Sequence, residues 1–250
     1  PWAVTVYGAP DTAEEGALIQ EIVGAEFAGA STHETEATTY APPWKFSPST
    51  CAAALTAIFL LAAVTLLTPQ PTHIVDAVLA RHGRIDILVN NAGIGVRAAD
   101  RKSVDAFPVE AWDEMIAIDL TGVFLMSRAV SAAMRKRGSG SFFFSNNAKS
   151  LRGTKRNTGE SLYYPRVMMR TLAQVLTEEY SEHGIHVANV VIDGLIDSPG
   201  TRALPRAHNN PDIIINPMKI AEAFFYLHTQ DRSCWTHELQ LTPFPTNPSH

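Results

Sequence analysis

The sequence has few cysteines, few charges and no excess of basic residues, and each shortage excludes a class of protein. Its 250 residues include only Cys51 and Cys234, too few for a disulfide framework or a cysteine metal cluster. The nine histidines lack the paired spacing of a zinc helix, so we expect no metal site. Charged residues make up 18% of the chain and the net charge is −5, which argues against nucleic acid as a partner. Reduced cysteines and the absence of a basic leader segment after Pro1 predict a cytoplasmic protein.

An uncharged run in the N-terminal third raises the question of a membrane. Residues Cys51 to Thr68 read CAAALTAIFLLAAVTLLT, which is just long enough for a short transmembrane span. The same pattern is typical of a buried helix that leads into a buried strand of a parallel sheet. Because the rest of the chain alternates strand and helix patterns, we favour burial and expect no membrane partner.

Strand and helix patterns alternate along the chain. Short apolar runs predict strands at Val4–Val6, Ile85–Val89, Ser141–Ser145, Ile185–Ile192 and Leu239–Leu241. Helical patterns predict helices at Ala13–Val23, Ile74–His82, Trp112–Arg137, Leu162–His183 and Ile220–Leu227. Three of these helices are followed by a glycine that is expected to end them, at Gly83, Gly138 and Gly184. The alternation predicts a single α/β domain over residues 1–250, a doubly wound parallel sheet with helices on both faces, in which residues 1–68 are atypical.

The turn Asn90-Asn91-Ala92-Gly93 follows one of these strands and is the first candidate for a binding site. In such sheets ligands bind beyond the carboxyl ends of the strands. Small residues there let a flat ligand approach the backbone, while asparagine side chains can hydrogen-bond neighbouring loops. Taken alone, the segment would be an ordinary Asn-Gly turn. Its interpretation therefore depends on the segments that accompany it.

Several segments together carry a family resemblance. They are GRIDILVNNAGI (Gly83 to Ile94), FPVEAWDEMIAIDLTGVFLMSRAV (Phe107 to Val130), SLRG (Ser150 to Gly153), RTLAQVLTEEYSEHGIHVANVV (Arg170 to Val191) and IDSP (Ile196 to Pro199). From Thr72 to Thr242 the chain resembles the short-chain dehydrogenase/reductase family. The resemblance implies a Rossmann-type fold and an oxidoreductase that uses NAD or NADP to interconvert a small-molecule alcohol and a ketone. It also implies a homodimer or homotetramer formed through the helices Thr121–Arg137 and Leu162–His183.

The family's phosphate-binding motif is altered in this chain. The motif places three glycines after the first strand, so that backbone N–H groups at a helix N-terminus can approach the pyrophosphate. Gly8 occupies the first of these places, but Thr12 and Glu14 occupy the other two. A carboxylate at Glu14 would repel the pyrophosphate. By resemblance, the cofactor-binding residues are Gly8, Asn90, Ala92, Gly93 and Ser198.

The family's catalytic residues are altered as well. The family uses an Asn that holds a water, a Ser that orients the carbonyl, a Tyr that acts as general acid and base, and a Lys that lowers the pKa of that Tyr. By resemblance, Asp119 takes the Asn position, Asn147 the Ser position and Arg166 the Lys position. The carboxylate of Asp119 could still hold a water, but it changes the local charge. Arg166 retains a positive charge on a bulkier, differently shaped group.

The position of the catalytic tyrosine is open. Counting back from the helix at Arg170 places Leu162 on it. A slip of one or two residues would present Tyr163 or Tyr164 instead. The alternative is that both tyrosines pack at the start of a helix, where Pro165 fits the first turn.

Three histidines are expected to have structural roles rather than catalytic ones. His183 and His186 flank Gly184 at a helix end, where pairing with the helix dipole or exposure to solvent is expected. His237 is expected to be a structural residue of the last strand.

Two functional hypotheses follow, together with one concern about the sequence. In the first, the chain is an active oxidoreductase with Tyr163 or Tyr164 as proton donor and Arg166 as its electrostatic aid. In the second, it is a catalytically silent member of the fold that acts by binding or oligomerisation, as the altered glycine motif and catalytic positions indicate. The concern is that residues 1–68 reflect a gene-model or reading-frame error, because the resemblance stops near Thr68.

Overall fold

The computed structural model of the chain describes residues 57–58, 72–91, 93, 104–151 and 164–248. All of them belong to one compact unit, Leu55–His250. The predicted strand Val4–Val6, the predicted helix Ala13–Val23 and the glycine motif at Gly8 lie outside the described residues. A single domain over the whole chain therefore stays a prediction.

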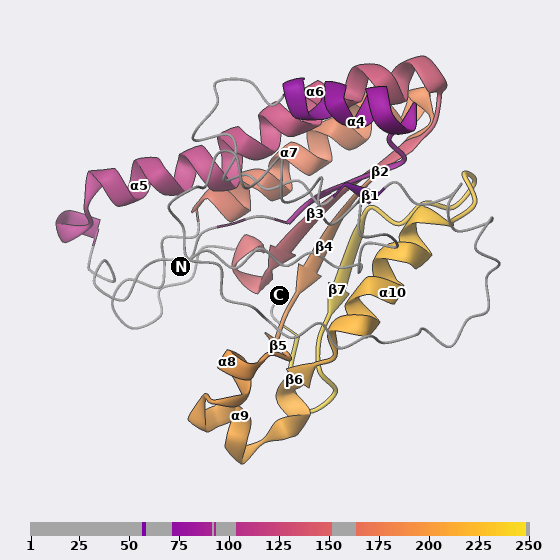
Figure 1. Ribbon diagram of the computed structural model, residues 1–250. Coiled ribbons are helices and arrows are strands. Elements are labelled where there is room, and N and C mark those ends of the chain that lie inside the picture. Colours follow the sequence, from indigo (N-terminus) through magenta and orange to yellow (C-terminus); the bar gives the residue numbers. More distant parts are fainter. Residues whose placement is uncertain (1–56, 59–71, 92, 94–103, 152–163, 249–250) are drawn as a thin grey trace. The chain divides into compact units, whose positions relative to one another are not determined.

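The described strands form a parallel sheet. In spatial order it consists of β1 (Ala57–Ile58), β2 (Ile87–Asn90), β3 (Gly140–Asn147), β4 (Ile185–Ile192) and β7 (Glu238–Leu241). Each neighbouring pair is parallel, so the chain must cross a face of the sheet between one strand and the next, as Figure 1 shows. The predicted α/β class is confirmed. β7 lies at an edge of the described sheet and is followed by Pro243 and Pro245, as the sequence predicted.

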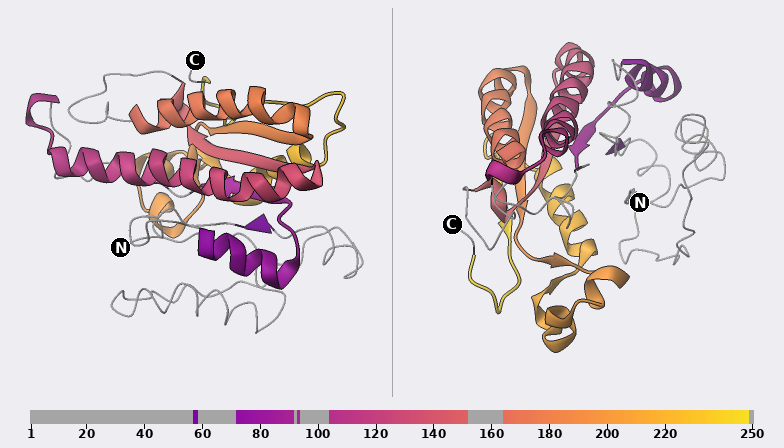
Figure 2. Two further views of the ribbon diagram at one scale, coloured as in Figure 1. Left: turned by 90° about the horizontal axis from the view of Figure 1, so that it is seen from above. Right: turned by 90° about the vertical axis from the view of Figure 1, so that its left-hand side faces the viewer.

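Helices cover both faces of this sheet. On one face lie α4 (Thr72–His82), α6 (Val123–Arg137) and α7 (Tyr164–Tyr180), and on the other lies α10 (Pro217–His228), as Figures 1 and 2 show. Three consecutive phenylalanines of β3 serve both faces. Phe142 and Phe144 pack with α6 and α7, whereas Phe143 packs with α10, because side chains alternate along a strand. Each buried ring of this kind contributes about 1.5–3 kcal/mol to folding.

One long helical segment runs along the first of these faces. Its parts are α5 (Val109–Ile116), η3 (Ala117–Gly122) and α6, which follow one another without a break. η3 is a π-helical stretch, a feature that often accompanies functional sites. By length and composition alone, Val109–Arg137 could cross a membrane, but half of its apolar window is buried inside the protein, as in a core helix.

Shorter elements connect β4 to α10. They are β5 (Leu195–Ile196), α8 (Pro199–Arg202), α9 (Pro205–Asn209), η6 (Pro211–Ile213) and β6 (Ile214–Ile215). β5 and β6 pair as a separate parallel sheet, and these elements lie beyond the carboxyl end of β4 (Figure 1). The remaining short helices are η2 (Val104–Ala106), η4 (Ala148–Ser150) and η5 (Ser181–His183).

The structure confirms three helix ends and the structural role of one histidine that the sequence predicted. Gly83, Gly138 and Gly184 have φ angles of 73°, 71° and 72°, a left-handed conformation that glycine adopts without steric cost. They end α4, α6 and η5 as predicted. Nδ1 of His237 lies 2.9 Å from the carbonyl oxygen of Val187, so this histidine holds the chain before β7 against β4.

The prediction for His186 was wrong. It does not sit exposed at a helix end but lies within β4, with 2% of its surface exposed. Its two ring nitrogens lie 3.0 Å from the carbonyl oxygen of Leu227 and 2.8 Å from that of Thr236. The reason is that β4 begins directly after Gly184, so the chain enters the core within two residues. His183 does lie at the helix end.

Candidate functional site

The carboxyl ends of β2 and β3 lie side by side. β2 ends at Asn90 and β3 at Asn147, and the parallel register aligns Asn90 with Phe144. Asn90 is buried, and its Nδ2 donates to Oγ of Ser127 in α6 at 3.2 Å. This bond attaches the end of β2 to the long helical segment, so Asn90 anchors the edge on which a ligand would lie.

A buried ion pair lies beside this edge. The side chain of Asp119 in η3 is 1% exposed and that of Arg166 in α7 is 13% exposed. Nε of Arg166 lies 3.3 Å from Oδ2 of Asp119, and Nη1 of Arg166 donates to the carbonyl oxygen of Ser145 at 3.0 Å. The two contacts join η3, α7 and β3 at one point. The pair carries no net charge, whereas the family's Asn and Lys would carry a positive one.

Gly93 makes room for this pair. A Cβ atom placed on Gly93 would overlap Nη2 of Arg166 and would lie 3.0 Å from Oδ1 of Asp119. Any side chain larger than hydrogen would therefore collide with the guanidinium. The sequence predicted that the small residues of this turn admit a flat ligand. On the side where a Cβ would stand, Gly93 admits Arg166.

Sequence reasoning located Asp119 and Arg166 but did not recognise them as partners. A signal was present, because the resemblance assigns a carboxylate to an uncharged position of the family and a guanidinium to its lysine position. Opposite charges that enter a buried site together are expected to pair. The contacts of Ser145 with Arg166 and of Ser127 with Asn90 leave no comparable pattern in the sequence.

The other predicted catalytic residues are described only in part. Asn147 is half-buried at the end of β3, and its carbonyl oxygen accepts a hydrogen bond from Oγ of Ser150 at 2.8 Å. Tyr164 is the first residue of α7, two residues before Arg166. Other predicted positions lie outside the described residues: Gly8, Ala92, Leu162 and Tyr163.

Ser198 makes local contacts at the start of α8. Its Oγ accepts a hydrogen bond from the N–H of Thr201 at 3.1 Å and lies 3.0 Å from Oγ1 of the same residue. The neighbouring Asp197 pairs with Arg202, whose hydrogen bond lowers the pKa of the Asp197 carboxyl. The hydroxyl that the resemblance assigns to the cofactor therefore caps a short helix in this structure.

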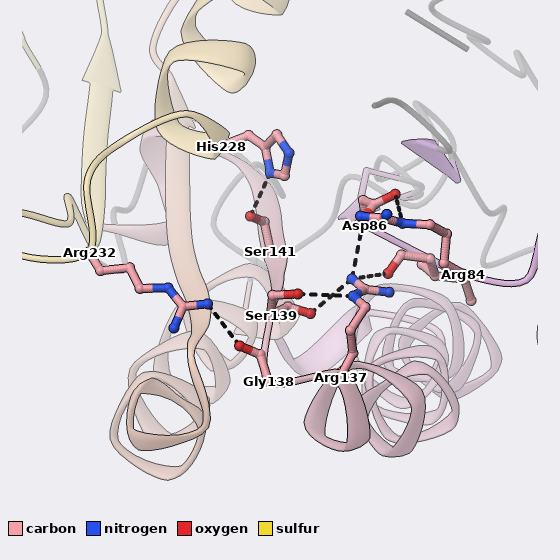
Figure 3. Close-up of polar contacts among 9 residues, drawn as sticks. Arg84, Asp86, Arg137, Gly138, Ser139, Ser141, His228 and Arg232 are labelled. Carbon is pink, nitrogen blue, oxygen red and sulfur yellow. Dashed lines mark hydrogen bonds and ion pairs between the residues drawn. The ribbon is translucent and has the colours of Figure 1, made fainter. Parts of the chain in front are cut away.

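A second polar cluster lies at the opposite, amino-terminal edge of the sheet, as Figure 3 shows. Asp86, just before β2, is bound by Arg84 and lies 3.3 Å from Nη2 of Arg137 at the end of α6. Nearby, Oγ of Ser141 lies 2.9 Å from Nδ1 of His228 at the end of α10. These contacts attach helix ends to the starts of β2 and β3. Within the described part of the chain, no three His, Cys, Asp or Glu side chains gather as a metal site.

One family of known proteins matches the chain over these elements. The family model for short chain dehydrogenases matches residues 48–209, more than half of the sequence. The chain belongs to the short-chain dehydrogenase family. The resemblance seen in the segments Gly83–Ile94 and Phe107–Val130 is therefore confirmed. Asp119 and Arg166 both lie within the residues that the family model matches.

Curated relatives are oxidoreductases of modest identity. An uncharacterized oxidoreductase of Thermotoga maritima is 30% identical over 146 residues, which are 58% of this chain and 55% of the relative. The 3-oxoacyl-(acyl-carrier-protein) reductase FabG of the same organism is 28% identical over 178 residues, 68% of this chain and 69% of the relative. The acetoacetyl-CoA reductase of Rhizobium meliloti is 33% identical over 158 residues, 60% and 62% of the two chains. The chain thus spans between 55% and 69% of the length of these relatives.

Solved structures agree with the fold. A metagenomic short-chain oxidoreductase in complex with NADP has a TM-score of 0.54 and 28% identity, covering 69% of this chain and 68% of its own. An alcohol dehydrogenase from the archaeon Thermococcus sibiricus has a TM-score of 0.58 with 22% identity, covering 72% of each chain. The second likeness concerns the fold alone. Together they confirm the predicted Rossmann-type arrangement of the chain.

Proposed function

We propose that this chain is an NAD- or NADP-dependent oxidoreductase that transfers hydride between nicotinamide and the carbon of a small-molecule alcohol or ketone. The observation that carries the proposal is the placement of Arg166. Its guanidinium, which the resemblance assigns to the family's lysine position, is held at the carboxyl edge of the sheet by Asp119 and Ser145. Similarity to an acetoacetyl-CoA reductase and to a 3-oxoacyl reductase supports a ketone of a 3-oxoacyl thioester as the substrate.

The described residues fit the nicotinamide end of such a cofactor. Gly93 is exposed, and a flat group would contact its backbone on the side away from Arg166, whose guanidinium fills the space where a Cβ would stand. Arg166 adds N–H donors beside Gly93, and Asn147 adds an amide at the end of β3. Ribose hydroxyls and carboxamides accept from such donors. A bound nicotinamide would supply or accept the hydride. Gly8, which would face the pyrophosphate, lies outside the described residues.

The chain's own residues have separate roles in this proposal. Tyr163 or Tyr164 would donate a proton to the carbonyl oxygen of the substrate. Asn147 orients that oxygen through its amide, in place of the family's serine. Arg166, two residues after Tyr164 in the sequence, provides a guanidinium whose direction Asp119 fixes.

Cofactor titration tests the proposal. NADH and NADPH are each added to the purified chain while nicotinamide fluorescence is followed, and turnover is then measured with acetoacetyl-CoA. Saturable binding together with consumption of one reduced cofactor supports the proposal. No binding at about 1 mM cofactor, the upper end of ordinary KM values, overturns it and favours the catalytically silent alternative.

Two substitutions identify the proton donor. Tyr163→Phe and Tyr164→Phe each remove one hydroxyl, and the variant that loses the acid is expected to lose about 10²- to 10⁴-fold in turnover. Cofactor binding by fluorescence serves as the control and should stay unchanged in both. Full turnover in both variants would exclude a tyrosine of this segment as the donor.

A double substitution tests whether the ion pair replaces the family's neutral and cationic residues. Asp119→Asn with Arg166→Lys restores the family's residue types at both positions. We expect the double variant to turn over at least as fast as the unmodified chain, whereas Arg166→Lys alone, which loses the planar guanidinium, should be slower. A double variant slower than both single variants would contradict the assignment of these positions.

The oligomeric state and the cellular location of the chain are also proposals. A homodimer or homotetramer is supported by exposed apolar side chains on α6 and α7, the two helices named by the resemblance. A cytoplasmic location, and the expectation of neither a nucleic-acid nor a membrane partner, rest on composition.

A further inference from the structure

α7 carries a second arginine one helical turn after Arg166. Arg170 follows by four residues, so the two side chains lie on the same side of the helix. Arg170 makes a two-pronged ion pair with Glu238 at the start of β7, with Nε to Oε2 at 2.6 Å and Nη2 to Oε1 at 2.7 Å. Such bidentate pairs fix both partners in orientation. The hydrogen bond from Arg170 lowers the pKa of the Glu238 carboxyl, so this group is ionised at neutral pH.

Glu238 begins a chain of amides between α7 and the sheet. Its Oε2 accepts from Nδ2 of Asn189 in β4 at 3.1 Å, and Oδ1 of Asn189 accepts from Nδ2 of Asn146 in β3 at 2.6 Å. Both asparagines are buried. A carboxylate can only accept, so Asn189 must donate to it and present its own oxygen to Asn146. The charge on Glu238 therefore sets the direction of both amides.

The side chain of Asn146 depends on this chain for its orientation. Its Oδ1 is buried without a hydrogen-bond partner among the described residues, so the bond to Asn189 is its anchor there. A buried amide held at one end can turn if that bond is lost. Loss of the Glu238 charge would thus change the orientation of the Asn189 amide and, through it, that of the Asn146 amide.

The backbone next to Asn146 contacts Arg166. Asn146 directly follows Ser145, and the peptide between them carries the carbonyl oxygen that accepts from Nη1 of Arg166 at 3.0 Å. Because a peptide is planar, a turn of the backbone at Asn146 redirects this carbonyl. The contacts thus form a closed ring from Arg170 through β7, β4 and β3 back to Arg166 on the same helix.

We infer that Glu238 is a positioning residue for the ion pair of Arg166 and Asp119. It acts from the last strand through the two buried amides and fixes where the guanidinium stands at the carboxyl edge. The catalytic meaning of that position rests on the proposed function, but the positioning itself does not. The competing explanation is that Arg170 and Glu238 only attach the edge strand β7 to α7. In that case Arg166 would not respond to a change at Glu238.

Arginine side-chain NMR separates the two explanations without any cofactor. The Nε–Hε signals of Arg166 and Arg170 are followed in the full chain and in Glu238→Gln. Positioning predicts that both signals shift and that the Arg166 proton exchanges faster with water. A shift of the Arg170 signal alone overturns the inference. The matched control is Glu222→Gln, which removes the exposed ion pair with Lys219 and should leave both signals in place.

Further variants apply if Glu238→Gln does not fold. Glu238→Asp retains the charge and Arg170→Lys retains a cation, so each should shift the Arg166 signal less than Asn189→Leu, which interrupts the amide chain while leaving the Arg170 ion pair intact. An unmoved Arg166 signal in Asn189→Leu also overturns the inference.

Turnover kinetics give a further test, because kcat should not change if Arg170 and Glu238 only attach β7 to α7. If the chain turns over as proposed, Glu238→Gln should lower kcat about tenfold with KM nearly unchanged, because the guanidinium is misplaced in the transition state. A folded variant with normal kcat contradicts positioning. If no turnover is found even in the unmodified chain, the proposed function fails, while the NMR result still decides the role of Glu238.

Discussion

Asp119 and Arg166 show how two altered residues can depend on each other. A buried ion pair adds little net stability, because the cost of desolvating both charges offsets their attraction. Removing one partner is costly, since the other charge stays in a nearly water-free place. The side chains are 1% and 13% exposed, so this asymmetry applies here. The two positions should therefore behave as a unit in substitution experiments.

Replacing one member of this pair should cost more than replacing both. Arg166→Met leaves the Asp119 carboxylate without its ion-pair partner, and we expect a loss of about 3–5 kcal/mol in the free energy of unfolding. Asp119→Asn combined with Arg166→Met removes both charges and should cost clearly less. Urea unfolding of four chains measures the difference: the unmodified protein, Arg166→Met, Asp119→Asn and the double variant. Additive losses would show that the two side chains are not coupled.

Gly93 should tolerate a methyl group only when Arg166 is absent. In Gly93→Ala the new Cβ overlaps the guanidinium, and such overpacking costs about 1–3 kcal/mol. With Arg166→Ala in the background the overlap with the guanidinium is gone and only the 3.0 Å contact with Oδ1 of Asp119 remains, so the same substitution should cost clearly less. Denaturant unfolding of the four chains in this cycle checks the expectation. If Gly93→Ala lowers the free energy of unfolding equally in both backgrounds, overlap with Arg166 is not the cause of the loss.

At the scale of elements, the sequence predicted what strong apolar patterns determine. β4 begins and ends at the predicted residues, Ile185–Ile192, because a glycine turn precedes a continuous buried run. The elements β5, β6, α8 and α9 were not predicted, since none exceeds five residues and such lengths show no period. The candidate site was likewise predicted only in part. Asp119 and Arg166 were located by their sequence context, but their contact depends on how η3 and α7 pack.

The attachment of α10 should weaken in acid. Burial lowers the pKa of His186, with the carbonyl oxygens of Thr236 and Leu227 offsetting part of the effect, and burial also lowers the pKa of His228. In the unfolded chain both titrate near pH 6.5, about their ordinary value. As the pH falls below this value the unfolded state takes up protons first, so stability that is complete above pH ~6.5 is lost.

Urea unfolding across this pH range measures the effect. The free energy of unfolding should fall from pH ~7.5 to pH ~5.5, and His186→Asn should flatten that slope. His208→Asn, an exposed position of α9, is the matched control and should retain the slope of the unmodified chain. A stability that rises on acidification would contradict the burial of these two rings as neutral groups.

At the scale of the whole molecule, one helical layer presents apolar side chains to solvent. Phe124 on α6 is 46% exposed, and Met168 and Val175 on α7 are 47% and 55% exposed. Met168 and Val175 are seven residues apart and so lie on one side of their helix. Only 18% of the chain is charged, so few charges compensate for this surface. Where exposed apolar side chains lie together on a single chain, they mark a place where another protein binds.

We expect the partner of this layer to be a second copy of the chain. Light scattering should give the mass of a dimer or tetramer for the unmodified protein. Val175→Glu combined with Phe124→Glu places two carboxylates on the exposed layer, and like charges brought together from both copies should shift the mass to that of a monomer. Val109→Glu is the matched control, because it changes an equally apolar and more exposed residue, at 66%, at the start of α5, outside the two predicted helices. If the unmodified chain is a monomer, or if only the control variant dissociates, this interface is wrong. The exposed layer would then be a surface that binds a different protein.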